Sequence, residues 1–425
     1  MSQSLIETPM AAAVRPTTDN RTGDWRFERP VFIRGMAPCM EACPLGVDVA
    51  SALLQVEEGD LKGALETFLA ENPLPGACGV ACFHPCESAC NRGKFDAPVS
   101  VRDLELFLAR ENNSGDFPSC SPSEVKDAPV AVLGSGPSVL SAAAFLARMG
   151  YRVSLYRDGR RLEDYLPEKS LEADASLSLV REEEGRILSS CESLGELKDF
   201  TRDEAERYGA VYLSPDLDIS KVEGAWSDGA LARALEEAGR MPGHYGLVVA
   251  GGRVIPVEAR VGRKGGSPEK GLPRDAAGGK RAALLVDMAL TGTDPLEMNS
   301  YEVGRTGILL FSSHGLGEKG DRFQKVIQFN RLNTSSFEEA ARIPSPGPGA
   351  VFSREEAVAS ARRCFHCGLC TFCFKCYDFC PDLSIIMDGK SRYRAIDLDH
   401  CKGCGICFEE CPRGAVDWVK EDKGA

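Results

Sequence analysis

The sequence predicts a multidomain protein of the α/β class, and three observations support this prediction. The C-terminal part contains the pattern Cys-x2-Cys-x2-Cys-x3-Cys-Pro twice, once ending at Pro381 and once at Pro412. The middle part opens with an apolar strand, a glycine turn and the start of a helix at residues 130–139. The N-terminal part combines regularly spaced cysteines with apolar residues at helical intervals. At 425 residues, the chain is long enough for two to four domains.

The repeated C-terminal pattern has the ligand spacing of a bacterial two-cluster ferredoxin. In that arrangement three thiolates spaced two residues apart bind one [4Fe-4S] cube, and the cysteine before the proline binds the other cube. We therefore predict one cluster on Cys370, Cys373, Cys376 and Cys411, and a second on Cys401, Cys404, Cys407 and Cys380. A zinc ribbon needs only four ligands, and disulfides do not explain the two Cys-Pro endings. Cys364 and Cys367 exceed the eight ligands, and the sequence does not decide between alternative ligands and plain thiols.

Composition narrows the classes of partner and compartment. The net charge of −13 argues against nucleic acid or an anionic membrane as the main partner. Eighteen cysteines at these spacings indicate a reduced, iron-loaded protein rather than a disulfide-bonded secreted one. Residues 1–19 lack a signal-peptide pattern, and no stretch reaches the apolar length of a transmembrane helix. We expect a cytoplasmic protein of anaerobic or microaerobic metabolism, because exposed clusters tolerate oxygen poorly.

The N-terminal cysteines form a second regular arrangement. It reads Cys39-x3-Cys43-Pro, followed by cysteines at every fourth position from Cys78 to Cys90. Two helices are predicted at residues 48–57 and 61–70 from their apolar spacing. Three further segments, at residues 37–44, 72–75 and 82–92, resemble the N-terminal iron–sulfur domain of glutamate synthase small subunits and dihydropyrimidine dehydrogenases. The resemblance covers most of residues 26–112, which we predict to be a helical iron–sulfur domain.

The resemblance implies a set of cluster ligands in this domain. In the family two clusters share these cysteines, and a polar side chain completes one of them. Carried over, Cys43, Cys82 and Cys86 hold one cube, with Glu105 at the position of the non-cysteine ligand. The second cube of the family uses Cys39 and Cys90 together with a Cys-x2-Cys pair just upstream, and no such pair is present there. We therefore expect one N-terminal cluster, with Cys39 and Cys90 left without partners. The alternative is that these thiols only fill a helical core.

Residues 128–300 resemble the flavin domain of the same family. There, residues 130–139 correspond to the FAD fingerprint, in which the pyrophosphate lies at a helix N-terminus. The resemblance implies cofactor contacts at Gly134, Gly136, Asp158 and Gly251.

Three positions depart from the flavin pattern. Val139 stands where the family has glycine, Arg157 replaces the acidic residue that binds the ribose, and Gly252 replaces an aspartate. We therefore expect a truncated Rossmann-like domain that does not retain FAD, although FAD binding remains the alternative. Only about 30 residues separate the strand at 210–214 from Gly246, which is too short for the nicotinamide-binding unit of the family.

The remaining chain is predicted to be a connector at residues 301–355 and a two-cluster ferredoxin domain at residues 356–420. Segments at 329–333, 337–342 and 354–364 resemble the tail of fused oxidoreductase subunits, as in phenylglyoxylate dehydrogenase-type complexes. The resemblance implies an electron-transfer subunit that relays single electrons between a catalytic subunit and an acceptor. No set of catalytic residues can be argued from the sequence. The alternatives are an FAD-dependent NAD(P)H:acceptor oxidoreductase subunit and an assembly scaffold with structural clusters.

Overall fold

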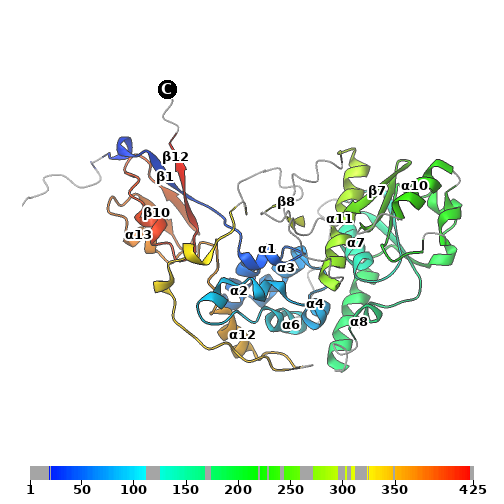
Figure 1. The fold of residues 1–425 in the computed structure, drawn as a ribbon, viewed down its shortest axis with the longest axis horizontal. Helices are drawn as coiled ribbons and strands as arrows, with labels where there is room; N and C mark the ends of the chain where they lie inside the picture. The colour runs from blue at the N-terminus through cyan, green and yellow to red at the C-terminus, as the bar shows by residue number, and fades with distance from the viewer. Residues whose placement is uncertain are drawn as a thin grey trace, which may run out of the picture. The chain divides into compact units, whose positions relative to one another are not determined.

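The computed structural model describes residues 19, 21–111, 125–167, 174–218, 221–226, 229–239, 244–258, 271–294, 302–303, 308–311, 323, 325–347 and 350–421. The chain divides into two compact units (Figure 1). We call Met36–Phe329 with Glu338–Cys367 the central unit, and Met1–Gly35, Asn330–Phe337 and Gly368–Ala425 the terminal unit. Residues 112–124, between the predicted iron–sulfur and Rossmann-like domains, lie outside the described residues.

The terminal unit is built from two small antiparallel sheets and two one-turn helices. Strand β1 (Glu28–Phe32) pairs with β12 (Val416–Lys420), and β10 (Ile385–Asp388) pairs with β11 (Tyr393–Ile396). The helices are α13 (Lys375–Asp378) and α14 (Ile406–Glu409). Apolar residues of the strands pack against cysteine side chains in the core of the unit. Strand β1 therefore belongs to the terminal unit, although the sequence analysis counted its residues in the N-terminal domain.

The first part of the central unit is helical. It contains α1 (Pro38–Ala42), α2 (Val49–Glu58), α3 (Leu61–Glu71), α4 (Pro75–Ala81), α5 (Pro85–Ser88), α6 (Val101–Glu111) and the later α12 (Arg354–Ala361). Asp48 accepts a hydrogen bond from the Ser51 N–H and caps α2, and Asp60 caps α3 in the same way. Gly59 ends α2 in the left-handed conformation that favours glycine. The two helices predicted from apolar spacing are therefore present.

The second part of the central unit contains a six-stranded sheet in the order β4-β3-β2-β5-β6-β7. The parallel strands are β2 (Pro129–Leu133), β3 (Arg152–Arg157), β4 (Ser193–Glu196) and β5 (Ala210–Leu213). The last two, β6 (His244–Ala250) and β7 (Arg253–Glu258), are antiparallel. Strand β2 pairs with both β3 and β5, so the strand order reverses beside it. Ligands of open α/β sheets bind at the carboxyl ends of the strands at such a point.

The remaining elements accompany this sheet. The helices are α7 (Pro137–Arg148), α8 (Asp174–Ser189), α9 (Arg202–Ala205), α10 (Gly229–Gly239) and α11 (Leu272–Thr291), and a short hairpin is formed by β8 (Glu302–Val303) and β9 (Ile308–Leu309). Turns of 3-10 helix occur at Gly23–Trp25, Asn91–Lys94, Leu162–Tyr165, Leu197–Asp199, Glu223–Ala225, Phe329–Arg331 and Thr334–Ser336. Between β5 and β6 the described residues contain a 3-10 turn and α10 but no strand.

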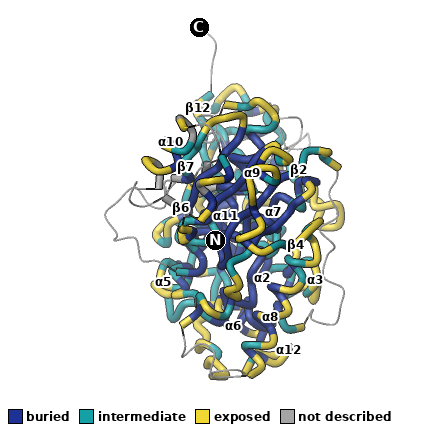
Figure 2. The backbone as a smooth tube through the Cα atoms, turned by 90° about the vertical axis from the view of Figure 1, so that its right-hand side faces the viewer, coloured by how far each residue is buried: buried dark blue, intermediate teal, exposed yellow. Residues whose placement is uncertain are grey.

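Helices α7 and α11 form the buried centre of this part (dark blue in Figure 2). A Cβ atom at Gly279 would lie 2.0 Å from the Ser138 carbonyl oxygen, so only glycine permits this close contact. Ser141 donates a 2.7 Å hydrogen bond to the carbonyl of Ala276. None of the helices in the described residues is long and apolar enough to span a membrane.

Candidate iron–sulfur sites and the glycine turn

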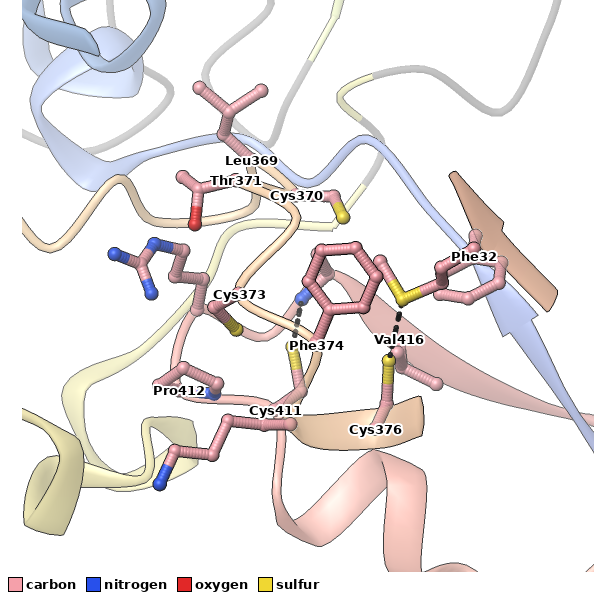
Figure 3. A pocket seen from close by; sticks show the side chains of 14 residues that line it. Phe32, Leu369, Cys370, Thr371, Cys373, Phe374, Cys376, Cys411, Pro412 and Val416 are labelled. Atoms are coloured by element: carbon pink, nitrogen blue, oxygen red, sulfur yellow. Dashed lines mark hydrogen bonds between the residues drawn. The ribbon is translucent and has the colours of Figure 1, made fainter. Parts of the chain in front are cut away.

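The first candidate site is a pocket of the terminal unit that four predicted ligands line (Figure 3). Its wall contains Cys370, Cys373, Cys376 and Cys411, together with apolar side chains such as Phe32. It holds about 330 Å³ of empty space, part of it open to solvent. The structure thus brings together the four cysteines that the spacing assigned to one cluster.

The second candidate site is a similar pocket in the same unit. It is lined by Cys380, Cys401, Cys404 and Cys407 and holds about 290 Å³. In both pockets the cysteine that precedes proline comes from the other cysteine run, which is the exchange that the sequence predicted. Each pocket therefore has four cysteines in its wall, three from one run and one from the other.

Backbone hydrogen bonds to sulfur repeat in the two pockets. The Ala415 N–H donates to Cys411 Sγ at 3.2 Å, and the Ser384 N–H donates to Cys380 Sγ at 3.3 Å. Each donor lies four residues after its cysteine. Hydrogen bonds to cluster sulfurs are one of the means by which proteins set cluster potentials. Both pockets therefore provide the donors, as well as the thiols, that a [4Fe-4S] cluster requires.

The third candidate site lies in the helical part of the central unit. In the structure Cys43, Cys82 and Cys86 lie close to Glu105, as the resemblance implied. Burial raises the pKa of each of these thiols, and the charge of Glu105 raises it further. Glu105 is buried on α6, and Asn72 donates a 2.8 Å hydrogen bond to its Oε1. Burial raises the pKa of Glu105 to about 8, although the Asn72 hydrogen bond opposes this shift.

Cys78 is a functional candidate at this site that the sequence analysis did not include. It lies on α4, one turn before Cys82, and is buried. Burial raises the pKa of its thiol well above the ordinary value, and the charges of Glu105 and Cys82 raise it further. The regular four-residue spacing from Cys78 to Cys90 was the available signal. Five potential ligands therefore surround this site, one more than a cube requires.

A carboxylate positions the helix that carries Cys78. Glu183 on α8 accepts hydrogen bonds from the N–H groups of Gly76 and Ala77, at 2.5 and 2.8 Å. These are N–H groups of the first turn of α4, which have no partner within the helix. Burial raises the pKa of Glu183 to about 7, against the opposing effect of the two N–H donors and Arg186.

The fourth candidate site corrects an expectation. Cys39 and Cys90 do have neighbouring thiols. These are Cys364 and Cys367, which belong to the last segment of the central unit in the sequence. Burial raises the pKa of Cys39 well above its ordinary value, and the charges of Cys90, Cys364 and Cys367 raise it further. Cys364 likewise raises the pKa of Cys90 and of Cys367, again after burial. No sequence pattern indicates this set, because its two halves are distant in the sequence.

Polar contacts hold the returning segment in place. Asn91 Nδ2 donates to Cys367 Sγ at 3.4 Å and to the Ile327 carbonyl at 2.8 Å. Arg363 donates to the carbonyls of Ala97 and Pro98, at 2.7 and 3.1 Å. Arg92 in turn donates to the Arg363 carbonyl at 3.2 Å. The segment that carries Cys364 and Cys367 is thus fixed against the residues that follow Cys90.

These cysteine groups do not have the geometry of single-ion sites. Among the described residues, no three or more His, Cys, Asp or Glu side chains converge closely enough to hold one metal ion. Zinc sites require four ligands within about 2.0–2.3 Å of one ion. A [4Fe-4S] cluster is held by four cysteines, each bound to a different iron atom, so its ligand sulfurs stay farther apart.

The glycine turn after β2 is occupied by the chain's own side chains. A Cβ atom at Gly136, where φ is 90°, would lie 2.7 Å from the Tyr165 ring. The Tyr165 hydroxyl donates a 2.8 Å hydrogen bond to Asp216, which also accepts one from Ser214. In dinucleotide-binding proteins the glycine at this position lets the backbone approach the pyrophosphate. Here the Tyr165 ring takes that place.

Two other predicted cofactor contacts, Asp158 and Gly134, lie at the glycine turn and contact protein side chains there. Asp158 lies near the glycine turn, where it accepts a 2.7 Å hydrogen bond from Ser135 and pairs with Arg160. A Cβ atom at Gly134 would lie 2.2 Å from Ser214 Oγ, so this glycine also faces protein rather than open space. Arg157 forms an ion pair with Glu184.

The structure does not bring Gly251 to the glycine turn. Strand β6 runs antiparallel to β5, with Ala250 opposite Ala210 at the amino end of β5. Gly251 therefore lies at the edge of the sheet opposite the carboxyl ends, where it lines a different pocket with Gly252 and Trp226. The sequence shows only that Gly251 follows an apolar strand. It does not show the direction of that strand in the sheet, because direction depends on pairing with other strands.

Comparison with known proteins finds similarity to iron–sulfur domains and to oxidoreductase subunits. Residues 33–116 match the family model described as dihydropyrimidine dehydrogenase domain II, 4Fe-4S cluster, and residues 394–417 match the 4Fe-4S binding domain. The chain is 26% identical over 351 residues to the NADPH-Fe(3+) oxidoreductase subunit beta of Geobacter sulfurreducens, which covers 74% of this chain and 49% of that protein.

Two further relatives match a shorter part of the chain. The NADP(+)-dependent formate dehydrogenase subunit beta of Moorella thermoacetica is 30% identical over 142 residues, covering 28% of this chain and 20% of that protein. The NAD-dependent dihydropyrimidine dehydrogenase subunit PreT of Escherichia coli is 31% identical over 122 residues, covering 28% and 30%. The chain thus spans half or less of the length of these curated relatives.

Proposed function

We propose that the chain, which is similar to iron–sulfur oxidoreductase subunits, relays single electrons between a catalytic subunit and an acceptor within a larger complex. The observation that carries this proposal is the pair of matched cysteine pockets in the terminal unit. A [4Fe-4S] cluster, when bound, supplies one-electron transfer at a potential that its surroundings adjust. The proposed ligands are Cys370, Cys373, Cys376 and Cys411 for one cluster, and Cys401, Cys404, Cys407 and Cys380 for the other.

The surface of the terminal unit supports electron exchange with a partner. Cys373 and Cys404 are exposed, so each proposed cluster has one ligand at the surface. Tyr377, Phe379 and Leu383 are 43%, 52% and 60% exposed, and they lie on either side of Cys380 at the end of the first cysteine run. Exposed apolar side chains gathered in one stretch are typical of protein contact surfaces. We infer that this stretch contacts the electron-transfer partner.

We propose a third cluster in the helical part of the central unit. Cys43, Cys82 and Cys86 would supply three thiolates, and Glu105 is the proposed fourth ligand, held by its hydrogen bond from Asn72. Cys78 is the alternative fourth ligand, since it shares the same surroundings. The variants Glu105→Gln and Cys78→Ser separate the two: the one that removes the true ligand is expected to lower cluster occupancy, and the other to leave it unchanged.

The six-stranded sheet is, in this proposal, a truncated Rossmann-like domain at residues 128–300 that serves as scaffold and does not retain FAD. Its order and crossover at β2 support the comparison with dinucleotide-binding sheets. The contact of Tyr165 with Gly136 and the ion pair of Arg157 with Glu184 support the loss of the cofactor. The other proposed domains are 26–112, the connector 301–355 and 356–420, in a cytoplasmic protein of anaerobic metabolism.

The decisive experiment combines cofactor analysis with one ligand variant of the purified full-length protein, prepared without oxygen. We expect no FAD in the supernatant after denaturation, and no oxidation of NADH or NADPH with artificial acceptors. Cys407→Ser is expected to remove one terminal cluster, about four Fe, whereas Cys191→Ser removes none, since Cys191 lies outside all four sites. One FAD per chain would favour the alternative, an FAD-dependent NAD(P)H:acceptor oxidoreductase. Unchanged reduction of the terminal clusters in Cys407→Ser would contradict the ligand assignment.

A further inference from the structure

We infer that Cys39, Cys90, Cys364 and Cys367 hold an additional [4Fe-4S] cluster, completed by a Cys-x2-Cys pair from the far end of the central unit. The inference deepens the proposed electron-transfer function and rests on it. The backbone of this pair resembles that of the first Cys-x2-Cys pair in each cysteine run of the terminal unit, Cys370–Cys373 and Cys401–Cys404.

These three Cys-x2-Cys loops share one backbone pattern. In each, the residue before the second cysteine and the residue after it both have positive φ. The first of these residues are His366, Phe372 and Gly403, at 47°, 55° and 70°, and the second are Gly368, Phe374 and Gly405, at 77°, 61° and 87°. A positive φ is uncommon outside glycine, so the agreement at His366 and Phe372 is not a matter of residue type. Such alternating conformations turn successive N–H groups inward and form the concave nests of many Fe–S sites.

The Cys364–Cys367 loop also shares a backbone hydrogen bond to sulfur with the proposed cluster site at Cys82. The His366 N–H donates to Cys364 Sγ at 3.3 Å, and the His84 N–H donates to Cys82 Sγ at the same distance. Both histidines have a positive φ and stand two residues after a cysteine. The His366 ring is held by the Ala50 carbonyl at 2.9 Å and by Glu57 at 2.7 Å. A strained residue that its surroundings fix in this way is typical of a functional loop.

Two of the four thiols are buried, and those of Cys90 and Cys364 are partly buried. Cys39 and Cys367 are 9% and 8% exposed, and all four cysteines are free of disulfides. Asn91, the residue after Cys90, lies 3.4 Å from Cys367 Sγ, so thiols from the two halves of the site are neighbours. Buried like charges are unfavourable unless a cation compensates them. Iron held by four thiolates supplies that compensation.

Hydrogen bonds hold the segment that carries Cys364 and Cys367 beside the segment that follows Cys90, although the two are distant in the sequence. Arg363, directly before Cys364, donates to the Ala97 and Pro98 carbonyls and to Asp96. Asn91, directly after Cys90, donates to Cys367 Sγ. Arg363, beside Cys364, thus binds the segment that follows Cys90. Asn91, beside Cys90, binds Cys367 in return. The pair that is missing upstream of Cys39 is supplied from downstream.

The first test is the composition of the anaerobically purified wild-type protein. We expect about sixteen Fe and sixteen sulfides per chain, four cubes in total. We also expect Cys364 and Cys367 to resist alkylation until the clusters are removed by a chelator. This measurement needs no variant, so it does not depend on how a substitution affects folding. About twelve Fe with free alkylation of Cys364 and Cys367 would overturn the inference, as would stoichiometric zinc.

The second test is the double variant Cys364→Ser/Cys367→Ser, with Cys191→Ser as the matched control. The double variant is expected to lose about a quarter of the iron, while the spectra of the two terminal clusters persist. The control is expected to keep all of it. Full iron content in the double variant would refute the site. Loss of the terminal clusters in wild type would instead count against the proposed function, so the two failures can be distinguished.

Discussion

Arg363 donates a 3.0 Å hydrogen bond to Asp96, and so joins segments that are 267 residues apart in the sequence. The two side chains are 3% and 14% exposed, and Asp96 also pairs with Arg92. The hydrogen bonds of Arg92 hold the pKa of Asp96 well below its usual range, although burial acts in the opposite direction. One carboxylate thus compensates two buried guanidinium groups beside the proposed additional cluster.

Asp96→Ala is therefore expected to be strongly destabilising. The substitution leaves Arg92 and Arg363 without their counter-charge, and removing one member of a buried pair costs about 3 kcal/mol. Urea unfolding of the anaerobic holoprotein measures the change. Glu206→Ala is the matched control, because Glu206 pairs with Arg202 on an exposed surface and its loss is expected to cost less than 1 kcal/mol. Equal effects of the two variants would rule out a structural role for the Asp96 contacts.

Gly136→Ala tests whether Tyr165 fills the glycine turn. Gly136 and Gly159 both have a φ of 90°, but a Cβ atom meets the Tyr165 ring only at Gly136 and nothing within 4 Å at Gly159. Both alanine variants should carry about 1–2 kcal/mol of backbone strain. Gly136→Ala should cost about 1 kcal/mol more, because the ring must leave its hydrogen bond to Asp216. In a Tyr165→Ala background this difference should vanish, and its persistence would contradict the contact.

Lys280→Met examines the buried ion pair that links α11 to α3. Lys280 Nζ lies 2.8 Å from Glu71 and donates to the Leu45 carbonyl at 2.5 Å, and both charged side chains are almost fully buried. The single substitution removes the Lys280 counter-charge from Glu71, which keeps the hydrogen bond from the Phe311 N–H, with an expected cost of about 3–5 kcal/mol. Lys280→Met combined with Glu71→Gln should recover much of this loss. Additive effects in the double-mutant cycle, measured by urea unfolding, would show that the two charges do not interact.

Glu183→Gln should change how stability depends on pH. The pKa of Glu183 is raised to about 7 in the folded protein, mainly by burial. A raised carboxyl pKa means that the folded state binds more protons than the unfolded state above pH 4.5. The stability associated with the protonated group is therefore lost as the pH rises through 7. Between pH 6 and pH 8 the wild type should lose about 1 kcal/mol more than the variant. Parallel pH profiles in urea unfolding would contradict this assignment.

The parts of the fold that the sequence predicted are those with local causes. Ferredoxin spacing places three cysteines of each terminal pocket on one short loop, so the pattern itself carries the geometry. The same holds for α2 and α3, whose Asp48 and Asp60 caps and apolar spacing are visible in the sequence. The exchange of the Cys-Pro cysteines was predicted from the repeated pattern for the same reason.

The parts that the sequence did not predict depend on contacts between distant residues. Cys364 and Cys367 read as surplus thiols because nothing in their spacing points to Cys39 or Cys90. Gly251 was grouped with the glycine turn because a strand pattern gives no direction, and only the pairing of β6 with β5 places it at the opposite edge. Tyr165 carries no cofactor signature, so its position against Gly136 required the structure.

The contact between Asn91 and Cys367 has a consequence for how the protein is made. These residues are 276 positions apart, so the additional site cannot close until the ribosome has synthesised most of the chain. Closing a flexible loop of that length costs roughly 5 kcal/mol plus a constant, which the intervening folded elements must first reduce. Iron insertion at this site is then expected to follow folding of the sheet between its two halves. A nascent chain that ends before Cys364 would carry Cys39 and Cys90 as unmetallated thiols. Assembly of this cluster would therefore depend on nearly complete translation of the chain.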